Sequence, residues 1–291
     1  MLDDVTTAPR PEFVYAELSV ADPGNVSRRL TIRERILDNA TARRAMVVLA
    51  LALAWELYAR YVGIDLLFPT FSETIAALWT AIVHGPLLAR LGISLEVLLM
   101  GYAAGVLLAG MLTALAISTR IGGDILSAAT AMLTPLPAIA LLPLAMLWFG
   151  LGMKSIVFII THSVLWPVAV NTYSGFQSVS ETQKMAGRNV GLRGLRYVTQ
   201  LLIPAAFPSI LAGLRIGWAF AWRTLIAAEM VFGVASRSGG LGWFILQSKN
   251  ELETATVFAG LLVILLMGLL IDGLVFRTIE RRTIQRWGMQ R

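Results

Sequence analysis

The chain has 291 residues, of which 57% are hydrophobic and 14% are charged, and its mean hydropathy is +0.72. A soluble domain carries about 25% charged residues, and several apolar runs here reach the roughly 20 residues of a membrane span, so this is not an ordinary soluble protein. No cysteine and only two histidines, His84 and His162, exclude disulfides, thiolate chemistry and a histidine-rich metal site, so we expect no cofactor.

The first 44 residues are polar and mixed in charge, which is typical of a cytoplasmic tail. Between Asn25 and Arg44, apolar residues lie among arginines, and Thr31 followed by Glu34 fits a helix-capping box. The pattern predicts a short amphipathic helix on the membrane surface, with a disordered tail as the alternative. Because the first forty residues contain no apolar core, we expect no cleaved signal peptide.

Six apolar segments predict six transmembrane helices, and they lie at 45–64, 95–117, 125–149, 155–176, 207–231 and 256–276. The fold class is therefore an all-α polytopic membrane bundle, with one transmembrane domain at 45–277 and a basic cytoplasmic tail at 278–291.

Several connections and breaks are also predicted. Residues 72–83 follow a proline break and have the pattern of a short amphipathic helix outside the membrane, and residues 120–124 read as a polar turn. The third segment contains Pro135, Pro137 and Pro143. Proline frees backbone groups that neighbours must satisfy, so we expect a kinked helix packed inside the protein.

The distribution of lysine and arginine predicts the orientation of the chain in the membrane. With both termini inside, seven of these cations fall in residues 1–44, one is Arg120, four fall in 177–200 and five begin at Arg277. That places 17 of the 24 inside and five outside, with Arg215 and Arg223 inside a span. The cations are expected to anchor the chain near anionic lipid rather than to bind nucleic acid.

No constellation of residues indicates an enzyme. The chain lacks a phosphate-binding loop, a nucleophile elbow and a zinc-protease helix. Residues 150–155 are faintly similar to a phosphate loop, but Met153 occupies the position of the glycine before lysine. We therefore expect no catalytic residues and no metal site.

Four ionisable residues are expected at membrane depth: Arg215, Arg223, Glu229 and Asp272. A charge at that depth costs at least about 2.5–3.5 kcal/mol, so each should face the protein interior or water. Arg223, with Trp222 or Trp218 as an apolar wall, could line a path that attracts anions, together with Arg215 and Glu229. The alternative is ion pairs between helices or snorkelling to the interface. For His162 we expect a hydrogen bond that serves packing.

Two glycine pairs, Gly101 with Gly105 and Gly213 with Gly217, match the small-xxx-small pattern of helix packing in membranes.

The stretch from 181 to 208 is too helical for a bare linker. Met185, Ala186, Val190 and Leu192 give it a small apolar face, and Gly191 permits a sharp turn. Pro204 and Pro208 are interpreted as the return to the membrane. We expect a short helical projection that docks into a groove on a soluble partner.

This stretch resembles the signature of permeases of binding-protein-dependent ABC importers: Glu-Ala-Ala, three residues, glycine, nine residues, then Ile-x-Leu-Pro. Here Gly191 is followed by nine residues and then by Leu201-Leu202-Ile203-Pro204. The first three positions read Met185-Ala186-Gly187, so the glutamate is absent. Residues 135–155, 166–180, 213–230 and 238–245 resemble the subfamily that imports nitrate, taurine, alkanesulfonates and related anions.

The resemblance covers roughly residues 60–287 and implies a type I importer permease fold. It implies two copies of a cytoplasmic ATP-binding subunit, a second copy of this chain as a homodimer partner, and a periplasmic or lipid-anchored solute-binding protein. ATP hydrolysis would reside in the partner, and the segment 177–206 would transmit it. The coupling residues implied are Met185, Ala186, Gly187, Gly191, Leu201, Ile203 and Pro204. The alternative function is a secondary transporter driven by an ion gradient.

Overall fold

A computed structural model describes residues 39–232 and 239–285. Most of the predicted amphipathic helix at Asn25–Arg44 lies outside the described residues. The chain divides into two compact units, residues 1–51 and 52–291. In the first unit the described residues are the start of helix α2, and the side-chain oxygen of Asn39 accepts a hydrogen bond from Thr41 N at 2.9 Å. The first predicted span, placed at 45–64, is therefore helical from Ala40.

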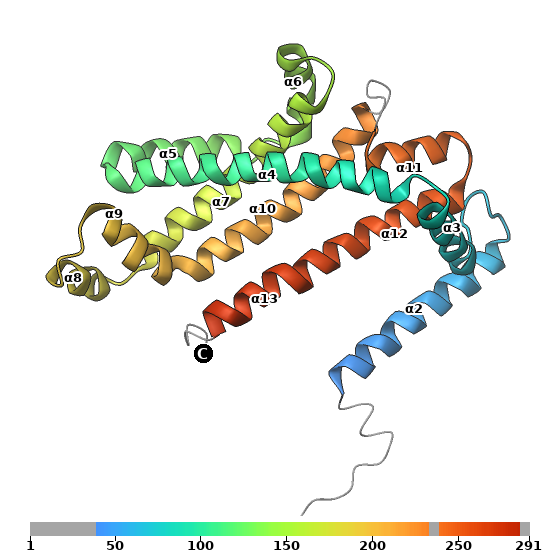
Figure 1. The fold of residues 1–291 in the computed structure, drawn as a ribbon, viewed down its shortest axis with the longest axis horizontal. Coiled ribbons are helices and arrows are strands. Elements are labelled where there is room, and N and C mark those ends of the chain that lie inside the picture. Colours follow the sequence, from blue (N-terminus) through green and yellow to red (C-terminus); the bar gives the residue numbers. More distant parts are fainter. Residues whose placement is uncertain (1–38, 233–238, 286–291) are drawn as a thin grey trace, which may run out of the picture. The chain divides into compact units, whose positions relative to one another are not determined.

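The described residues form helices joined by short connections, and none of them is in a β-strand. The elements are α2 Ala40–Val62, α3 Phe71–Val83, α4 Leu87–Ser118, α5 Arg120–Leu133, η1 Ala138–Leu141, α6 Leu142–Phe149, α7 Met153–Ser178, α8 Glu181–Asn189, α9 Gly194–Tyr197, η2 Val198–Leu202, α10 Ile203–Phe232, α11 Leu241–Asn250, α12 Thr254–Leu270, η3 Ile271–Phe276, α13 Arg277–Glu280 and η4 Arg281–Gln285 (Figure 1).

Five continuous helical segments are long and apolar enough to cross a membrane, at 40–62, 87–118, 153–178, 194–231 and 254–284. A sixth span is made if α5 and the helical segment Ala138–Phe149 are counted together. The described helices therefore agree with the six spans predicted from sequence. Several boundaries differ: for example, α4 begins eight residues before the predicted start, and the predicted tail at 278–291 is helical as far as Gln285.

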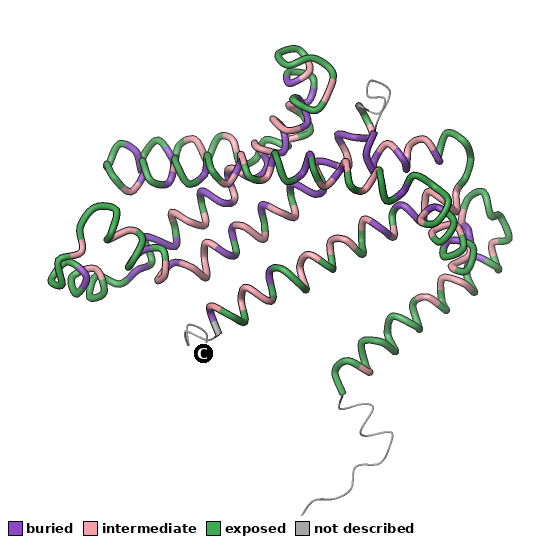
Figure 2. Tube along the Cα trace, viewed as in Figure 1, coloured by how far each residue is buried: buried purple, intermediate pink, exposed green. Residues whose placement is uncertain are grey.

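The core is built around α7, which packs between α4 and α10. A Cβ placed on Gly101 of α4 would lie 2.6 Å from Ile160 Cβ, and one on Gly105 would lie 2.6 Å from Val164 Cβ. Farther along α7, a Cβ on Gly213 of α10 would lie 2.8 Å from Asn171 Cβ. The predicted small-residue packing is confirmed, since only glycine lets these backbones approach so closely. Figure 2 shows buried residues recurring along α4, α7 and α10, whereas α2 is almost entirely exposed or intermediate.

The third span is broken rather than kinked. α5 ends at Leu133, and the helical segment that begins at Ala138 leaves it at 88°. Pro135 and Pro137 lie in the connection, where neither can donate the backbone hydrogen bond that would continue the helix. The predicted polar turn at 120–124 is wrong: these residues form the first turn of α5, because Thr119 Oγ1 accepts from Gly122 N at 2.9 Å and caps the helix.

The predicted short helix at 72–83 is confirmed as α3. Thr70 and Glu73 form a reciprocal capping box at its start. The end of α2 is fixed to this region, since Trp55 Nε1 donates to Pro69 O at 3.0 Å and the Glu56 carboxylate accepts from Ser72 N at 3.0 Å. α11 and α12 complete the unit beside α10 and α3.

Candidate functional site

The first candidate region is the helical projection between α7 and α10, residues 181–197, which we call the elbow. Its helix α8 begins at Ser180, whose hydroxyl accepts from Gln183 N at 3.3 Å. In the first turn Lys184 Nζ donates to Glu181 Oε1 at 2.9 Å. This hydrogen bond is the largest cause of a pKa of Glu181 below its ordinary value. Local contacts therefore define the start of α8.

The end of α8 is a sharp reversal at Gly191, as the sequence predicted. Leu192 N donates to Gly187 O and Gly191 N donates to Arg188 O, each at 3.0 Å. This pair of bonds is a Schellman motif, which requires a left-handed residue at its turn, and Gly191 has φ +83°. The elbow thus has a fixed shape set by the backbone of one glycine.

A contact between Gly187 and Leu201 fastens α8 to the chain that leads into α10. Gly187 is buried, and a Cβ placed on it would lie 2.8 Å from Leu201 Cδ2. Leu201 belongs to the π-helical segment η2, and Ile203 and Pro204 form the first turn of α10 directly after it. Pro204 and Pro208 therefore lie within a continuous helix rather than at the end of a loop.

Below this contact the elbow rests on a small hydrophobic cluster. Phe176 and Val179 at the end of α7 pack with Leu202 and Ala206 at the start of α10. The guanidinium of Arg188 lies 5.9 Å from the centre of the Tyr197 ring, a cation–π contact that joins α8 to α9. Motion of the elbow would therefore reach both α7 and α10.

The outer face of the elbow carries apolar side chains in solvent. Met185, Val190 and Leu195 are 58%, 77% and 79% exposed, and Ala186 is exposed as well. A groove of about 470 Å³ lies between the ends of α4 and α7 and the elbow; Glu181, Lys184 and Arg188 contribute to its lining, whereas the exposed apolar residues do not. Exposed apolar residues on a short, well-fixed helix are typical of a surface that a partner covers.

The charges on the membrane spans divide into two kinds. Arg215 on α10 forms an ion pair with Asp272 on η3, in which Nη2 lies 2.7 Å from Oδ2, and Nη1 lies 3.9 Å from Glu280 Oε2. Arg223 is different, because none of the described carboxylates forms an ion pair with it. Its guanidinium carbon lies 5.9 Å from the centre of the Phe220 ring.

Glu229 is 4% exposed and lies where α10, α4 and α11 meet. Its carboxylate accepts a hydrogen bond from Gly242 N at 2.8 Å, and Ser94 Oγ lies 2.7 and 2.8 Å from its two oxygens. Glu229 is therefore enclosed at a junction of three helices, whereas Arg223 on the same helix is exposed.

The two predicted tryptophans also pack between helices. Trp222 Nε1 donates to Ile264 O of α12 at 3.3 Å, and Trp218 contacts the edge of the Tyr102 ring. The structure thus does not bring the five predicted pathway residues into one cluster, and their role in a pathway stays a prediction.

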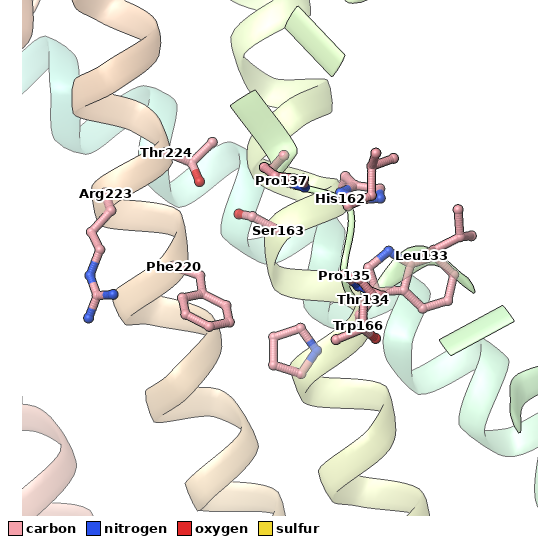
Figure 3. Close-up of a pocket in the computed structure, with 13 residues that line it drawn as sticks. Leu133, Thr134, Pro135, Pro137, His162, Ser163, Trp166, Phe220, Arg223 and Thr224 are labelled. Atoms are coloured by element: carbon pink, nitrogen blue, oxygen red, sulfur yellow. The ribbon is translucent and has the colours of Figure 1, made fainter. Parts of the chain in front are cut away.

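The second candidate region is a pocket of about 230 Å³ at the break in the third span. Figure 3 shows its lining from three parts of the chain: Pro135 and Pro137 at the break, His162 and Trp166 on α7, and Phe220, Arg223 and Thr224 on α10. Of the pathway residues predicted from sequence, only Arg223 lines it. The prolines of the third span were the one sequence signal for this site.

The expectation for His162 was wrong. Neither ring nitrogen of His162 has a hydrogen-bond partner among the described residues, although both atoms are buried. Among residues 39–232 and 239–285, no three His, Asp or Glu side chains are grouped as a metal site would require.

Comparison with known proteins identifies the family. Residues 101–285 match the family described as "binding-protein-dependent transport system inner membrane component". This protein is an ABC importer permease of that family. The elbow lies inside the matched region, as do α7 and α10, and the permease has the helical architecture of the type I fold.

The permease has relatives of the nitrate, taurine and sulfonate type. It is 30% identical over 264 residues to the taurine transport system permease protein TauC of Escherichia coli (strain K12), which covers 88% of this chain and 93% of TauC. It is 29% identical over 221 residues to the putative aliphatic sulfonates transport permease protein SsuC of the same strain, covering 76% and 82%. The nitrate import permease protein NrtB of Synechocystis sp. is 31% identical over 179 residues, covering 62% and 64%.

Proposed function

We propose that this permease forms the translocation pathway for a small anionic solute and takes its energy from a separate ATPase that docks on the elbow. The observation that carries the proposal is the exposed apolar face of α8 and its flanks. Met185 and Val190 are uncovered, while Gly187 behind them is buried against Leu201. One face of the elbow is thus anchored to the membrane helices, and the other is free for a partner.

The anchoring supports transmission of force. A push on α8 passes through the Gly187–Leu201 contact to η2, which continues without a break into α10. The cluster of Phe176, Val179, Leu202 and Ala206 carries it to the end of α7. Because α7 and α10 pack closely along their length, they would move together, and alternating access would follow from their rocking.

The family supports the rest of the assembly. The proposed complex contains two copies of the permease, two ATP-binding subunits on the cytoplasmic side and a solute-binding protein on the other side of the inner membrane. Both termini lie in the cytoplasm, as the lysine and arginine distribution predicts. ATP is hydrolysed by the partner, and the coupling residues are those of the elbow and the start of α10.

The relatives and one side chain support an anionic solute. The related proteins are named for taurine, aliphatic sulfonates and nitrate. In this chain Arg223 is a cation within a membrane span, and no described carboxylate neutralises it. Ionisable residues within membrane spans mark substrate and ion pathways in many membrane proteins.

Reconstitution tests the proposal. The permease is co-expressed with a candidate ATPase and a candidate solute-binding protein from the same genome, and the complex is placed in liposomes with labelled taurine, ethanesulfonate or nitrate outside. We expect uptake that requires both enclosed ATP and the binding protein. Uptake by the permease alone, driven by an ion gradient without ATP, would instead establish a secondary transporter.

A further inference from the structure

The pocket at the break of the third span has no assigned role, and its lining carries a positive charge but no negative one. Of its thirteen lining residues none is acidic, and Arg223 is at its edge. Trp166 is 7% exposed, and its Nε1–H has no acceptor among the described residues. The two nitrogens of His162 also lack partners there. The pocket therefore holds unpartnered ring nitrogens on His162 and Trp166, and none of its lining residues is a carboxylate that could pair with them.

Such donors are rare inside proteins. Almost all buried polar groups find a partner, so an unpaired indole N–H next to an unpaired imidazole calls for an explanation. Indole can only donate, and a neutral imidazole donates through one of its nitrogens. From α10, the hydroxyl of Thr224 can donate or accept, whereas the guanidinium of Arg223 can only donate. A group with acceptor oxygens would pair with the donors among these side chains.

The position of the pocket suits a solute in transit. His162 is nine residues from the start of α7 at Met153, and Arg223 is nine residues from the end of α10 at Phe232. At 1.5 Å per residue each lies about 14 Å along its helix, close to half of a hydrocarbon core of about 30 Å. The volume of about 230 Å³ is below that of drug-sized sites and fits a small solute.

The shape of the pocket depends on the break itself. A continuous third span would place helix turns where Pro135 and Pro137 now turn the chain through 88°. Broken helices at membrane depth are tolerated where they line a cavity. Figure 3 shows Arg223 at the edge, with its side chain running along α10 and away from His162. It is thus placed to attract an anion toward the inner donors rather than to fill the pocket.

We propose that this pocket is an oxyanion subsite of the translocation pathway, in which the buried nitrogens of Trp166 and His162 become accessible when the pathway opens and donate to a sulfonate, nitrate or similar group that Arg223 attracts. This inference rests on the proposed function for its place in transport. It differs from the arrangement predicted from sequence, since Trp218 and Trp222 pack elsewhere and the donors come from α7.

The local test follows Trp166 in the full-length permease in lipid nanodiscs. The eight tryptophans are labelled as 5-fluorotryptophan, and the ¹⁹F resonance of Trp166 is identified by its absence in Trp166→Phe. We expect ethanesulfonate or nitrate to shift this resonance saturably, while tetramethylammonium leaves it in place. Arg223→Gln should raise the half-saturating concentration about tenfold, because the anion then loses the attraction of a nearby cation. Trp79→Phe, an exposed change on α3, should not alter it.

Transport by the assembled complex separates the two proposals. We expect Trp166→Phe and Arg223→Gln to reduce ATP-dependent uptake, again by about tenfold, while the ATPase still co-purifies. The subsite is refuted if no anion shifts the Trp166 resonance, even when uptake is normal. It is also refuted if the half-saturating anion concentration is the same in Arg223→Gln as in the wild type. A wild-type complex that imports none of these anions refutes the proposed function, whereas the resonance measured on the permease alone still decides the subsite.

Discussion

Glu229 of α10 and Ser94 of α4 are joined by a buried hydrogen bond across 135 residues of sequence. The same Ser94 oxygen accepts from Leu241 N at 2.7 Å, and Glu229 accepts from Gly242 N at 2.8 Å. The two side chains therefore fix the start of α11 to both other helices. Arg90 adds to this junction, since its Nη1 donates to Gly239 O at 2.6 Å.

Removal of the Ser94 hydroxyl should destabilise this junction. Ser94→Ala leaves a buried carboxylate with one donor fewer, which costs about 1–3 kcal/mol. We expect a lower thermal unfolding midpoint in detergent for Ser94→Ala. Ser118→Ala on the same helix is the control, because Ser118 Oγ donates only to Ala114 O of its own helix. Equal midpoints for the two variants would contradict a structural role of the Glu229–Ser94 bond.

The conformation of Gly191 should decide coupling. A Cβ added there meets nothing within 4 Å, so the penalty of a substitution comes from its positive φ alone. Gly191→Ala should cost about 1–2 kcal/mol in the turn and reduce ATP-dependent uptake about 5- to 30-fold. Gly191→Asn should retain more uptake than Gly191→Ala, because asparagine tolerates the left-handed region.

A steric explanation of the Gly191 effect would predict the opposite order, since asparagine is the larger residue. Uptake is measured in reconstituted complexes containing equal amounts of permease. Gly110→Ala on α4 serves as the control, because its Cβ also meets nothing within 4 Å and its φ is ordinary. This variant should fold and transport as the wild type does.

The apolar face of the elbow should determine attachment of the ATPase. Met185→Glu and Val190→Glu place charges where a partner would bury side chains, and the loss of one such contact weakens binding by about 10- to 100-fold. Both residues are exposed, so the unfolding midpoint of the isolated permease should not change. Thr182→Glu adds the same charge to α8 without removing apolar surface. Co-purification of the ATPase with all three variants would show that the elbow is not the docking surface.

Sequence predicted the features that depend on local spacing. The pairs Gly101 with Gly105 and Gly213 with Gly217 were identified because small residues four apart share one helix face. Gly191 was identified because a reversal after a short helix favours glycine. Both features can be predicted from sequence without knowing which helix packs against them.

Features that depend on distant parts of the chain were missed. No local pattern links Ser94 to Glu229, and none shows that Arg215 would meet Asp272 on another helix. The pocket was not predicted because Pro135 and Pro137 indicate a bend but give neither its 88° angle nor the side chains around it. His162 was expected to have a hydrogen-bond partner because the sequence does not show which residues surround it.

Close packing of α4 on α7 should make Gly101 intolerant of a side chain. A Cβ there would overlap Ile160, so Gly101→Leu forces the two helices apart, and overpacking of this kind costs about 1–3 kcal/mol or more. Gly110→Leu puts the same side chain on the same helix in open space. We expect Gly101→Leu alone to lower the yield and the unfolding midpoint in detergent. Recovery in Gly101→Leu with Ile160→Ala would identify the overlap as the cause.

The ion pair between Arg215 and Asp272 distinguishes a structural charge from a pathway charge. Arg215→Ala leaves Asp272 without its arginine, and Asp272→Ala leaves the cation alone, so each single change should lower the unfolding midpoint. The double variant removes both charges, and we expect it to recover most of the midpoint and of ATP-dependent uptake, because a lone charge is costlier than none. Uptake that remains lost in the double variant, with its midpoint restored, would instead place Arg215 in the solute path beside Arg223.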